Sequence, residues 1–318
     1  MGETLISRLD AQLAAHGIAP AALWPMHYDA VLITGPTASG KSALSMALAA
    51  LWRASIISVD SALVYRSMNI GSAKPSAAEQ ASVPHHLIDL IDPAHSYSVA
   101  QFIADAQTAL NHCKTEQRLP LLVGGTMMYV NALYKGLSPL PAGDAALRAA
   151  IESQAAQLGW PALHAQLAQV DAVTAQRLAP QDAQRIERAL EVYQATGKPL
   201  SQWVQESVPS EPLAAQGRWL HLSIEPEKML LWQRIEQRFD AMLADGFLDE
   251  VRALKARGDL HSNLPSIRCV GYRQAWAHLE GETTLPAMRE LGVIATRQLA
   301  KRQMTWLRAM PQRVVVGL

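Results

Sequence analysis

Short apolar runs alternate with stretches of helical spacing along the first 140 residues of the chain. The runs lie at residues 30–34, 55–59, 86–90 and 119–123. Between them come stretches such as residues 98–116, where apolar positions recur every three or four residues. Buried parallel strands read as continuous apolar runs, and each needs a helical crossover to reach the next. The pattern therefore predicts an α/β fold, a parallel sheet covered by helices on both faces.

The pattern changes between about residues 141 and 217, where the chain becomes helical throughout and rich in Ala, Gln and Arg. We expect an inserted all-helical subdomain there. Residues 220–224 predict a return to the sheet, residues 227–256 one long amphipathic helix, and residues 314–316 a closing strand. The expected organisation is an N-terminal extension at 1–28, a core at 29–140 and 218–318, and the helical insert at 141–217.

Composition excludes several classes of protein. The 318 residues are 49% hydrophobic and 18% charged, which is enough for a substantial core. No run approaches the ~18 consecutive apolar residues of a membrane span, and the N-terminus lacks the three regions of a secretory signal. Cys113 and Cys269 lie far apart without zinc-ligand spacing, which fits a reducing cytosol. We expect a cytoplasmic protein with no membrane partner.

Charge is balanced overall but not along the chain. Twenty-eight basic and 28 acidic residues cancel, so the net charge does not indicate nucleic acid. The last 28 residues, 291–318, contain no Asp or Glu and five basic side chains: Arg297, Lys301, Arg302, Arg308 and Arg313. A charged helix face is usually only solvated surface, so this basic segment indicates RNA only together with other features.

The octapeptide GPTASGKS at residues 35–42 follows the first apolar run directly. It matches the P-loop pattern G-x-x-x-x-G-K-[ST], in which a glycine-rich turn and the start of a helix hold phosphate. Gly35 and Gly40 allow close backbone approach, Lys41 supplies positive charge, and the Ser42 hydroxyl can ligate Mg²⁺. The sequence thus predicts binding of a diphosphate or nucleotide by Gly35, Pro36, Thr37, Ala38, Ser39, Gly40, Lys41 and Ser42, with Mg²⁺ on Ser42.

Two features separate the chain from an ordinary NTPase. The run at residues 119–123 is followed by Gly124-Gly125-Thr126 and not by the carboxylate that assists Mg²⁺ in NTP hydrolysis. A carboxylate instead ends the run at residues 55–59, as Asp60, at the sheet edge where parallel strands present their ligand loops. A lone Asp is also a common helix cap, but this position favours a catalytic base beside the phosphate site. By itself, Thr126 reads as a hydroxyl that caps the next helix.

Seven segments resemble the bacterial tRNA dimethylallyltransferases, also called tRNA isopentenyltransferases. In order along the chain they are GPTASGKS, ISVDSALVYRSMNIGSAKP, PHHLIDLIDP, PLLVGGTMMY, QRIERALEVY, SIRCVGYRQAW and TRQLAKRQMTWLR. The resemblance covers roughly residues 29–308 and implies a P-loop NTPase-like fold with a tRNA-binding insert. It implies transfer of a dimethylallyl group from dimethylallyl diphosphate to the exocyclic N6 amine of the adenosine 3′-adjacent to the anticodon, in tRNAs reading codons that begin with U.

The resemblance also implies roles for individual residues. Asp60 would remove the proton from the adenine amine, and Thr126 would hydrogen-bond near the reacting centre. The tRNA contacts that it implies are Asp60, Ser61, Ala62, Leu63, Thr126, Arg148, Gln184, Arg185, Ile186, Glu187, Arg188, Arg268, Cys269, Val270, Gly271, Tyr272, Arg273, Lys301, Arg302, Gln303, Met304, Thr305, Trp306, Leu307 and Arg308. Tyr272 and Trp306 are candidates to stack on bases. The expected partners are Mg²⁺, dimethylallyl diphosphate and a tRNA anticodon stem-loop, bound by a monomer.

Two other classes of protein stay open on the residues alone. A small-molecule or nucleotide kinase would share the P-loop and use Arg185 and Arg188 as lid arginines, but it leaves Gly124-Gly125-Thr126 and the basic segment unexplained. A non-catalytic RNA-binding module would leave the phosphate loop and Asp60 without a task. The first 28 residues are longer than the family leads us to expect and carry no chemistry. A C-terminal zinc finger like that of eukaryotic relatives is not seen, which favours a bacterial-type enzyme.

Overall fold

The computed structural model describes residues 2–310 and 312–317, which form two compact units. One unit comprises Met1–Tyr134 and Pro212–Leu318, and the other comprises Lys135–Glu211. Both bounds of the insert lie earlier than the expected 141–217. At its start, the backbone of Leu137 already exchanges hydrogen bonds with Ser210, within the second unit. At its end, Leu213 is buried in the core of the first unit.

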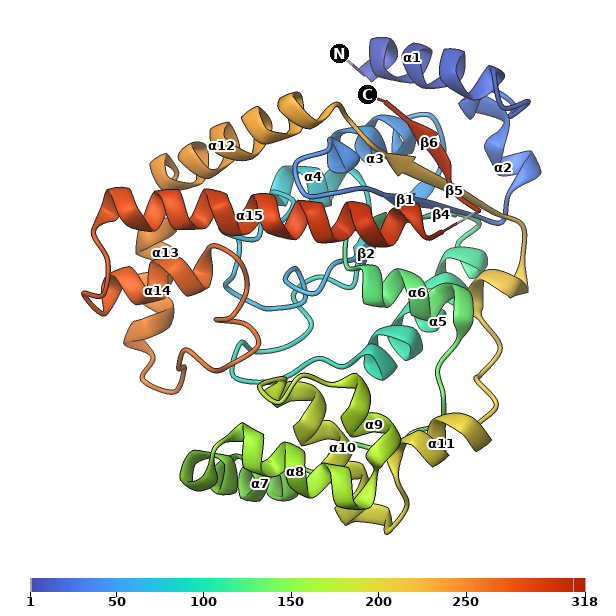
Figure 1. The fold of residues 1–318 in the computed structure, drawn as a ribbon. Coiled ribbons are helices and arrows are strands. Elements are labelled where there is room, and N and C mark those ends of the chain that lie inside the picture. Colours follow the sequence, from blue (N-terminus) through green and yellow to red (C-terminus); the bar gives the residue numbers. More distant parts are fainter. Residues whose placement is uncertain (1, 311, 318) are drawn as a thin grey trace. The chain divides into compact units, whose positions relative to one another are not determined.

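The first unit is built on one parallel sheet (Figure 1). Its strands are β1 (Ala30–Thr34), β2 (Ala54–Val59), β3 (His85–His86), β4 (Leu119–Gly124), β5 (Trp219–Ile224) and β6 (Val314–Val316). Their spatial order is β3-β2-β4-β1-β5-β6, and every pairing is parallel. All residues of β1, β2 and β4 are buried, as their continuous apolar runs predict. The predicted α/β fold with a parallel sheet is confirmed.

Helices cover both faces of the sheet. On one face, α1 (Gly2–Ala14), α2 (Trp24–His27) and α3 (Lys41–Ala49) pack with alternate residues of β1, Val31 and Ile33. On the other, α5 (Val99–Thr115) and α6 (Met127–Lys135) pack with Ala30 and Leu32. Because strand side chains alternate between faces, β1 contributes to both cores. The N-terminal extension is part of this core, since Leu9, Leu13 and Trp24 are fully buried in it.

The segment expected as a third strand at residues 86–90 leaves the sheet after His86. Leu87 and Asp89 have positive φ angles of +61° and +53°, which no continuing strand allows. The backbone N–H of Asp89 donates to the carbonyl oxygen of Leu63 at 3.0 Å, and its carboxylate accepts from Lys74 Nζ. The turn at 87–89 therefore supports the loop that follows β2, where α4 (Ala77–Ser82) also lies.

Four helices complete the first unit: α12 (Lys228–Ala244), α13 (Phe247–Ala256), α14 (Tyr272–Leu279) and α15 (Leu285–Arg308). The single helix expected at 227–256 is wrong, because the chain breaks at Gly246, whose φ is +94°. The break turns Phe247 into a second apolar core, where its ring meets those of Phe239 and Tyr272. None of the helices in the described part of the chain is long and apolar enough to cross a membrane.

The second unit is entirely helical. It contains α7 (Ala145–Leu158), α8 (Trp160–Val170), α9 (Ala172–Arg177), α10 (Ala183–Thr196) and α11 (Leu200–Glu206). Its own core holds Ile151, Leu163, Leu167 and Ile186, each at most 1% exposed. Two short 3₁₀ helices lie in the first unit, at Ala21–Leu23 and Leu213–Gln216.

Candidate active site

The glycine-rich loop leaves β1 and enters α3, as its sequence predicts. Gly35 has a φ of +153°, and a Cβ atom there would lie 2.5 Å from the carbonyl oxygen of Ile224 on β5. Gly40 has a φ of +99° and is the N-cap of α3, which begins at Lys41. Only glycine meets both demands without strain. The loop therefore places the N-terminal end of α3 toward any anion that it encloses.

Lys41 folds back over this loop. Its Nζ donates to the carbonyl oxygens of Gly35 at 3.0 Å and Pro36 at 2.7 Å. Burial lowers the pKa of Lys41 to about 8, and the nearby Asp60 carboxylate partly counters that effect. The Ser42 hydroxyl makes no hydrogen bond within the described residues, so it is available to a hard cation.

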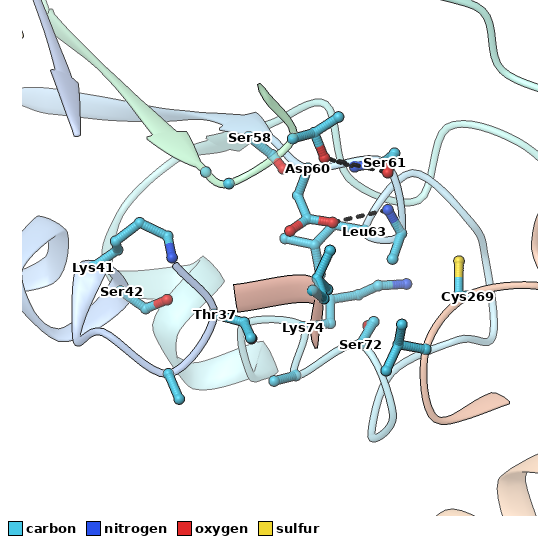
Figure 2. A pocket seen from close by; sticks show the side chains of 18 of the residues that line it. Thr37, Lys41, Ser42, Ser58, Asp60, Ser61, Leu63, Ser72, Lys74 and Cys269 are labelled. Carbon is cyan, nitrogen blue, oxygen red and sulfur yellow. Dashed lines mark hydrogen bonds between the residues drawn. The ribbon is translucent and has the colours of Figure 1, made fainter. Parts of the chain in front are cut away.

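Asp60 shares a cavity of about 660 Å³ with the loop. Figure 2 shows Lys41 and Ser42 on one side of this cavity, Cys269 on the opposite side, and Asp60 between them. One carboxylate oxygen of Asp60, Oδ1, accepts from the backbone N–H of Ala62 at 2.8 Å. The other oxygen has no hydrogen-bond partner among the described residues. Asp60 is thus held in one orientation with one oxygen free to accept a proton.

Thr126 lies beside Asp60 because β2 and β4 are neighbours, with Val59 opposite Gly124. Its hydroxyl accepts from the backbone N–H of Ser61 at 2.9 Å and donates to Ser61 Oγ at 3.2 Å. The hydroxyl is therefore used across the sheet edge and not as a cap for α6. The structure brings together the two residues that the sequence singled out as catalytic.

Arg238 on α12 is a residue that sequence reasoning missed. It lines the same cavity, and it has no carboxylate partner within the described residues. Burial lowers the pKa of its guanidinium, and the charge of Asp60 counters this. The available signal was its position next to Phe239, on the edge of the apolar face of an amphipathic helix. No role was predicted for it from the sequence.

The other residues singled out around this cavity come from three loops or helices. Ser61, Ala62 and Leu63 follow Asp60, Arg268, Cys269, Val270, Gly271 and Tyr272 precede or begin α14, and Arg302, Gln303 and Trp306 lie on α15. Burial raises the pKa of the Cys269 thiol to about 12. Arg273, Lys301, Thr305 and Arg308 are exposed outside the cavity, Met304 is partly buried and Leu307 is fully buried.

The proposed stacking of Tyr272 on a base is wrong. Its side chain is fully buried, its hydroxyl donates to Glu250 Oε1 at 2.6 Å, and its ring centroid lies 5.1 Å from that of Phe247. Glu250 also accepts from the backbone N–H groups of residues 69–71. Trp306, by contrast, is 49% exposed at the cavity edge and is free to stack.

Two of the five basic side chains in the segment 291–318 are paired with carboxylates. Arg297 pairs with Glu236 at 3.2 Å, and Arg313 pairs with Glu225 at 2.9 Å. Both carboxylates come from other parts of the chain, which the local sequence could not reveal. Lys301, Arg302 and Arg308 are exposed and have no carboxylate partner among the described residues.

In the second unit, two of the arginines expected to contact RNA are hydrogen-bonded to a carboxylate within the protein. Arg148 Nε donates to Glu191 at 2.9 Å and Arg188 donates to Glu191 at 2.6 Å, although the carboxylate of Glu191 is fully buried. These bonds lower the pKa of Glu191 against the opposing effect of burial. Arg185 is exposed and pairs with Asp182. Gln184 is also exposed, Ile186 is buried and Glu187 is half-buried.

No group of three or more His, Cys, Asp or Glu side chains is placed to hold a metal ion in residues 2–310 and 312–317. A P-loop whose neighbouring strand ends in Gly124-Gly125, together with a carboxylate that keeps one oxygen free, defines the class of protein. It is a P-loop group transferase fold, in which a phosphate-binding loop faces a carboxylate across one cavity.

Comparisons with known proteins identify the family. The model of the family described as IPP transferase matches residues 63–310, and that described as isopentenyl transferase matches residues 28–95. The chain therefore belongs to the IPP transferase family.

Named relatives are similar over most of their length. The chain is 58% identical over 285 residues to a tRNA dimethylallyltransferase of Paraburkholderia phymatum, covering 89% of this chain and 90% of the relative. It is 58% identical over 291 residues to one of Ralstonia nicotianae, covering 90% of each. Among solved structures, the full-length tRNA isopentenylpyrophosphate transferase of Bacillus halodurans has a TM-score of 0.63 and 34% identity, covering 90% of this chain and 89% of that one. A eukaryotic dimethylallyltransferase acting on tRNA has a TM-score of 0.75 and 25% identity, covering 91% and 73%.

Proposed function

We propose that this protein transfers a dimethylallyl group from dimethylallyl diphosphate to the N6 amine of the adenosine 3′-adjacent to the anticodon, in tRNAs reading codons that begin with U. The observation that carries the proposal is one cavity with a phosphate cradle on one side and the half-free carboxylate of Asp60 across from it. The names of the similar proteins support the choice of donor and acceptor.

The reaction forms one bond and breaks one. The N6 nitrogen attacks C1 of the allyl group, the C1–O bond breaks, and diphosphate leaves with the electron pair. The amine is a poor nucleophile because its lone pair is delocalised into the ring, so its proton must pass to a base as the new bond forms. The free oxygen of Asp60 would take that proton. Thr126 would hold the Ser61 turn and thereby keep Asp60 in place.

Charge on the leaving group grows as the C1–O bond breaks. Lys41 and Arg238 line the cavity and would bind the diphosphate more tightly in the transition state than in the ground state, which accelerates the reaction. Mg²⁺ would add further positive charge on the diphosphate. The exposed, unbonded hydroxyl of Ser42 fits a cation that takes most of its ligands from phosphate and water.

The RNA would lie along the exposed part of α15. Lys301, Arg302 and Arg308 are the cations there without an ion-pair partner in the described residues, and Trp306 is the exposed ring beside the cavity. The target adenosine must leave its stack to enter the cavity, and an exposed aromatic at the entrance suits that movement. Of the cations expected in the second unit, Arg185 is the most available. We propose that the protein acts as a monomer in the cytoplasm.

The test combines donors and acceptors. Purified protein is incubated with dimethylallyl diphosphate or ATP, with and without unmodified tRNA, and the RNA is digested and analysed for N6-dimethylallyl adenosine. We expect product only from dimethylallyl diphosphate with tRNA. Asp60→Asn should lose about 10²-fold or more in single-turnover rate while it still binds inorganic diphosphate. Phosphate transfer from ATP without prenylated product would favour the kinase alternative and refute this proposal.

A further inference from the structure

Gln303 on α15 is buried between the two loops that form the site. Its side chain is 8% exposed, and both ends of its amide are hydrogen-bonded to backbone. Oε1 accepts from the N–H of Thr37 in the glycine-rich loop at 2.9 Å, and Nε2 donates to the carbonyl oxygen of Gly125 at 2.8 Å. An amide side chain supplies a donor and an acceptor at once from two different atoms and carries no charge. Gln303 therefore joins the phosphate loop to the turn that precedes Thr126.

The fit between these groups is close. A Cβ atom on Gly125 would lie 2.5 Å from Gln303 Nε2 and 3.1 Å from the carbonyl oxygen of Gly35. The turn after β4 consequently passes against the phosphate loop with no room for a side chain. The contacts then continue from Gly125 to Thr126 and from the Thr126 hydroxyl to the backbone of Ser61, next to Asp60. One unbroken series of contacts runs from the diphosphate cradle to the proposed base.

We propose that Gln303 is a positioning residue that keeps the phosphate loop and the Thr126 turn at a fixed spacing, so that the allylic carbon of the bound donor stays within reach of the attacking amine. The inference rests on the proposed function. It also differs from the expected role of Gln303 as an RNA contact, because both polar ends of the side chain are bonded inside the protein. A displacement of about 1 Å between reacting groups can cost on the order of 10²-fold in rate, so such a residue acts on turnover without touching the substrate.

The inference predicts a separation between binding and turnover. Gln303→Met keeps the length and volume of the side chain and removes both hydrogen bonds. We expect its single-turnover rate to fall by about 10- to 100-fold, while the affinity for inorganic diphosphate stays within about threefold, because the cradle itself is intact. Gln298→Met is the matched control, since Gln298 lies on the same helix and its exposed side chain makes no hydrogen bond in the described residues.

A second variant gives a signature that a purely structural role would not produce. In Gln303→Glu the ionised carboxylate still accepts from Thr37 but faces the Gly125 carbonyl oxygen without a proton to donate. The protonated acid restores both bonds, so the ratio of variant to wild-type rate should rise as the pH falls. Taking the ratio cancels the pH dependence that both proteins share, since the charged groups that line the same cavity, Lys41, Asp60, Arg238 and Arg302, are common to both.

The outcomes are distinct. A wild-type rate in Gln303→Met, a rate loss matched by the loss of diphosphate affinity, or a pH-independent ratio for Gln303→Glu would each overturn the positioning role. If Gln303→Met does not fold, the pH dependence of Gln303→Glu decides alone. A wild-type protein that forms no prenylated tRNA would instead refute the proposed function, before either variant is measured.

Discussion

The lowered pKa of Lys41 makes diphosphate binding depend on pH in a range where an ordinary lysine stays charged. Burial brings this pKa to about 8, from an ordinary value of 10.5. Only the protonated amine attracts the negatively charged diphosphate, so the contribution of Lys41 to the affinity must decrease as the pH rises. The contribution of Lys41 to affinity should be nearly full at about pH 7 and should fall as the pH rises through about 8.

The expected size follows from the fraction of protonated Lys41. With a pKa of about 8, that fraction falls from about 90% at pH 7 to about 10% at pH 9. If the protonated form binds and the neutral form does not, the affinity for inorganic diphosphate falls about tenfold, or ~1.4 kcal/mol. An ordinary lysine would still be almost fully charged at pH 9, and the affinity would hardly change.

Isothermal titration calorimetry with inorganic diphosphate between pH 7 and 9.5 measures this effect. Inorganic diphosphate loses its own last proton within that range, so each affinity is divided by that of Lys41→Arg, whose guanidinium stays charged and which shares the ionisation of the ligand. Asp60→Asn provides an internal check, because the Asp60 charge raises the pKa of Lys41 and its removal should move the midpoint to lower pH. A flat ratio up to pH 9.5, or an upward shift of its midpoint in Asp60→Asn, would refute the electrostatic account of the site.

Three further predictions concern the loop, the metal and the RNA surface. Gly35→Ala should abolish diphosphate binding in a protein that still folds, because the new Cβ would lie 2.5 Å from the carbonyl oxygen of Ile224; calorimetry and circular dichroism check this, and unchanged binding would contradict it. Ser42→Ala should raise the Mg²⁺ concentration for half-maximal turnover about tenfold or more, and an unaltered Mg²⁺ titration would remove Ser42 from the metal site. Arg302→Ala should reduce the slope of log affinity for an anticodon stem-loop against log salt by about 0.7, whereas Arg252→Ala, on α13, should leave it unchanged. Equal slopes for the two variants would show that Arg302 does not contact the RNA.

Structural features formed by residues close together in the sequence could be predicted from it. The apolar run of β1, the glycine-rich loop and the start of α3 are consecutive, so their geometry follows from local rules of burial and backbone freedom. Asp60 and Thr126 could be placed near each other because parallel strands share one edge for their carboxyl ends. The roles assigned to them stay predictions.

Contacts between residues far apart in the sequence could not be predicted from it. Arg148 and Arg188 read as free cations, but both bind the buried carboxylate of Glu191, which only the packed helices bring between them. No role was predicted for Arg238, and Gln303 was expected to contact RNA. Only the packed structure brings Arg238 to the cavity and bonds Gln303 to Thr37 and Gly125. The break at Gly246 was missed because the apolar spacing continues on both sides of it, while the deciding quantity is a backbone angle.

The strand order sets when the phosphate loop can form during synthesis. β1 lies between β4 and β5, and Val31 pairs with both Leu121 and Leu220. The ribosome must therefore complete the whole helical insert before the last neighbour of β1 exists. The insert is one continuous segment with its own core, so it can fold while the sheet is still open. A nascent chain stalled within the insert would carry the complete GPTASGKS sequence without a closed cradle, since the β5 carbonyl that packs against Gly35 has not yet been made.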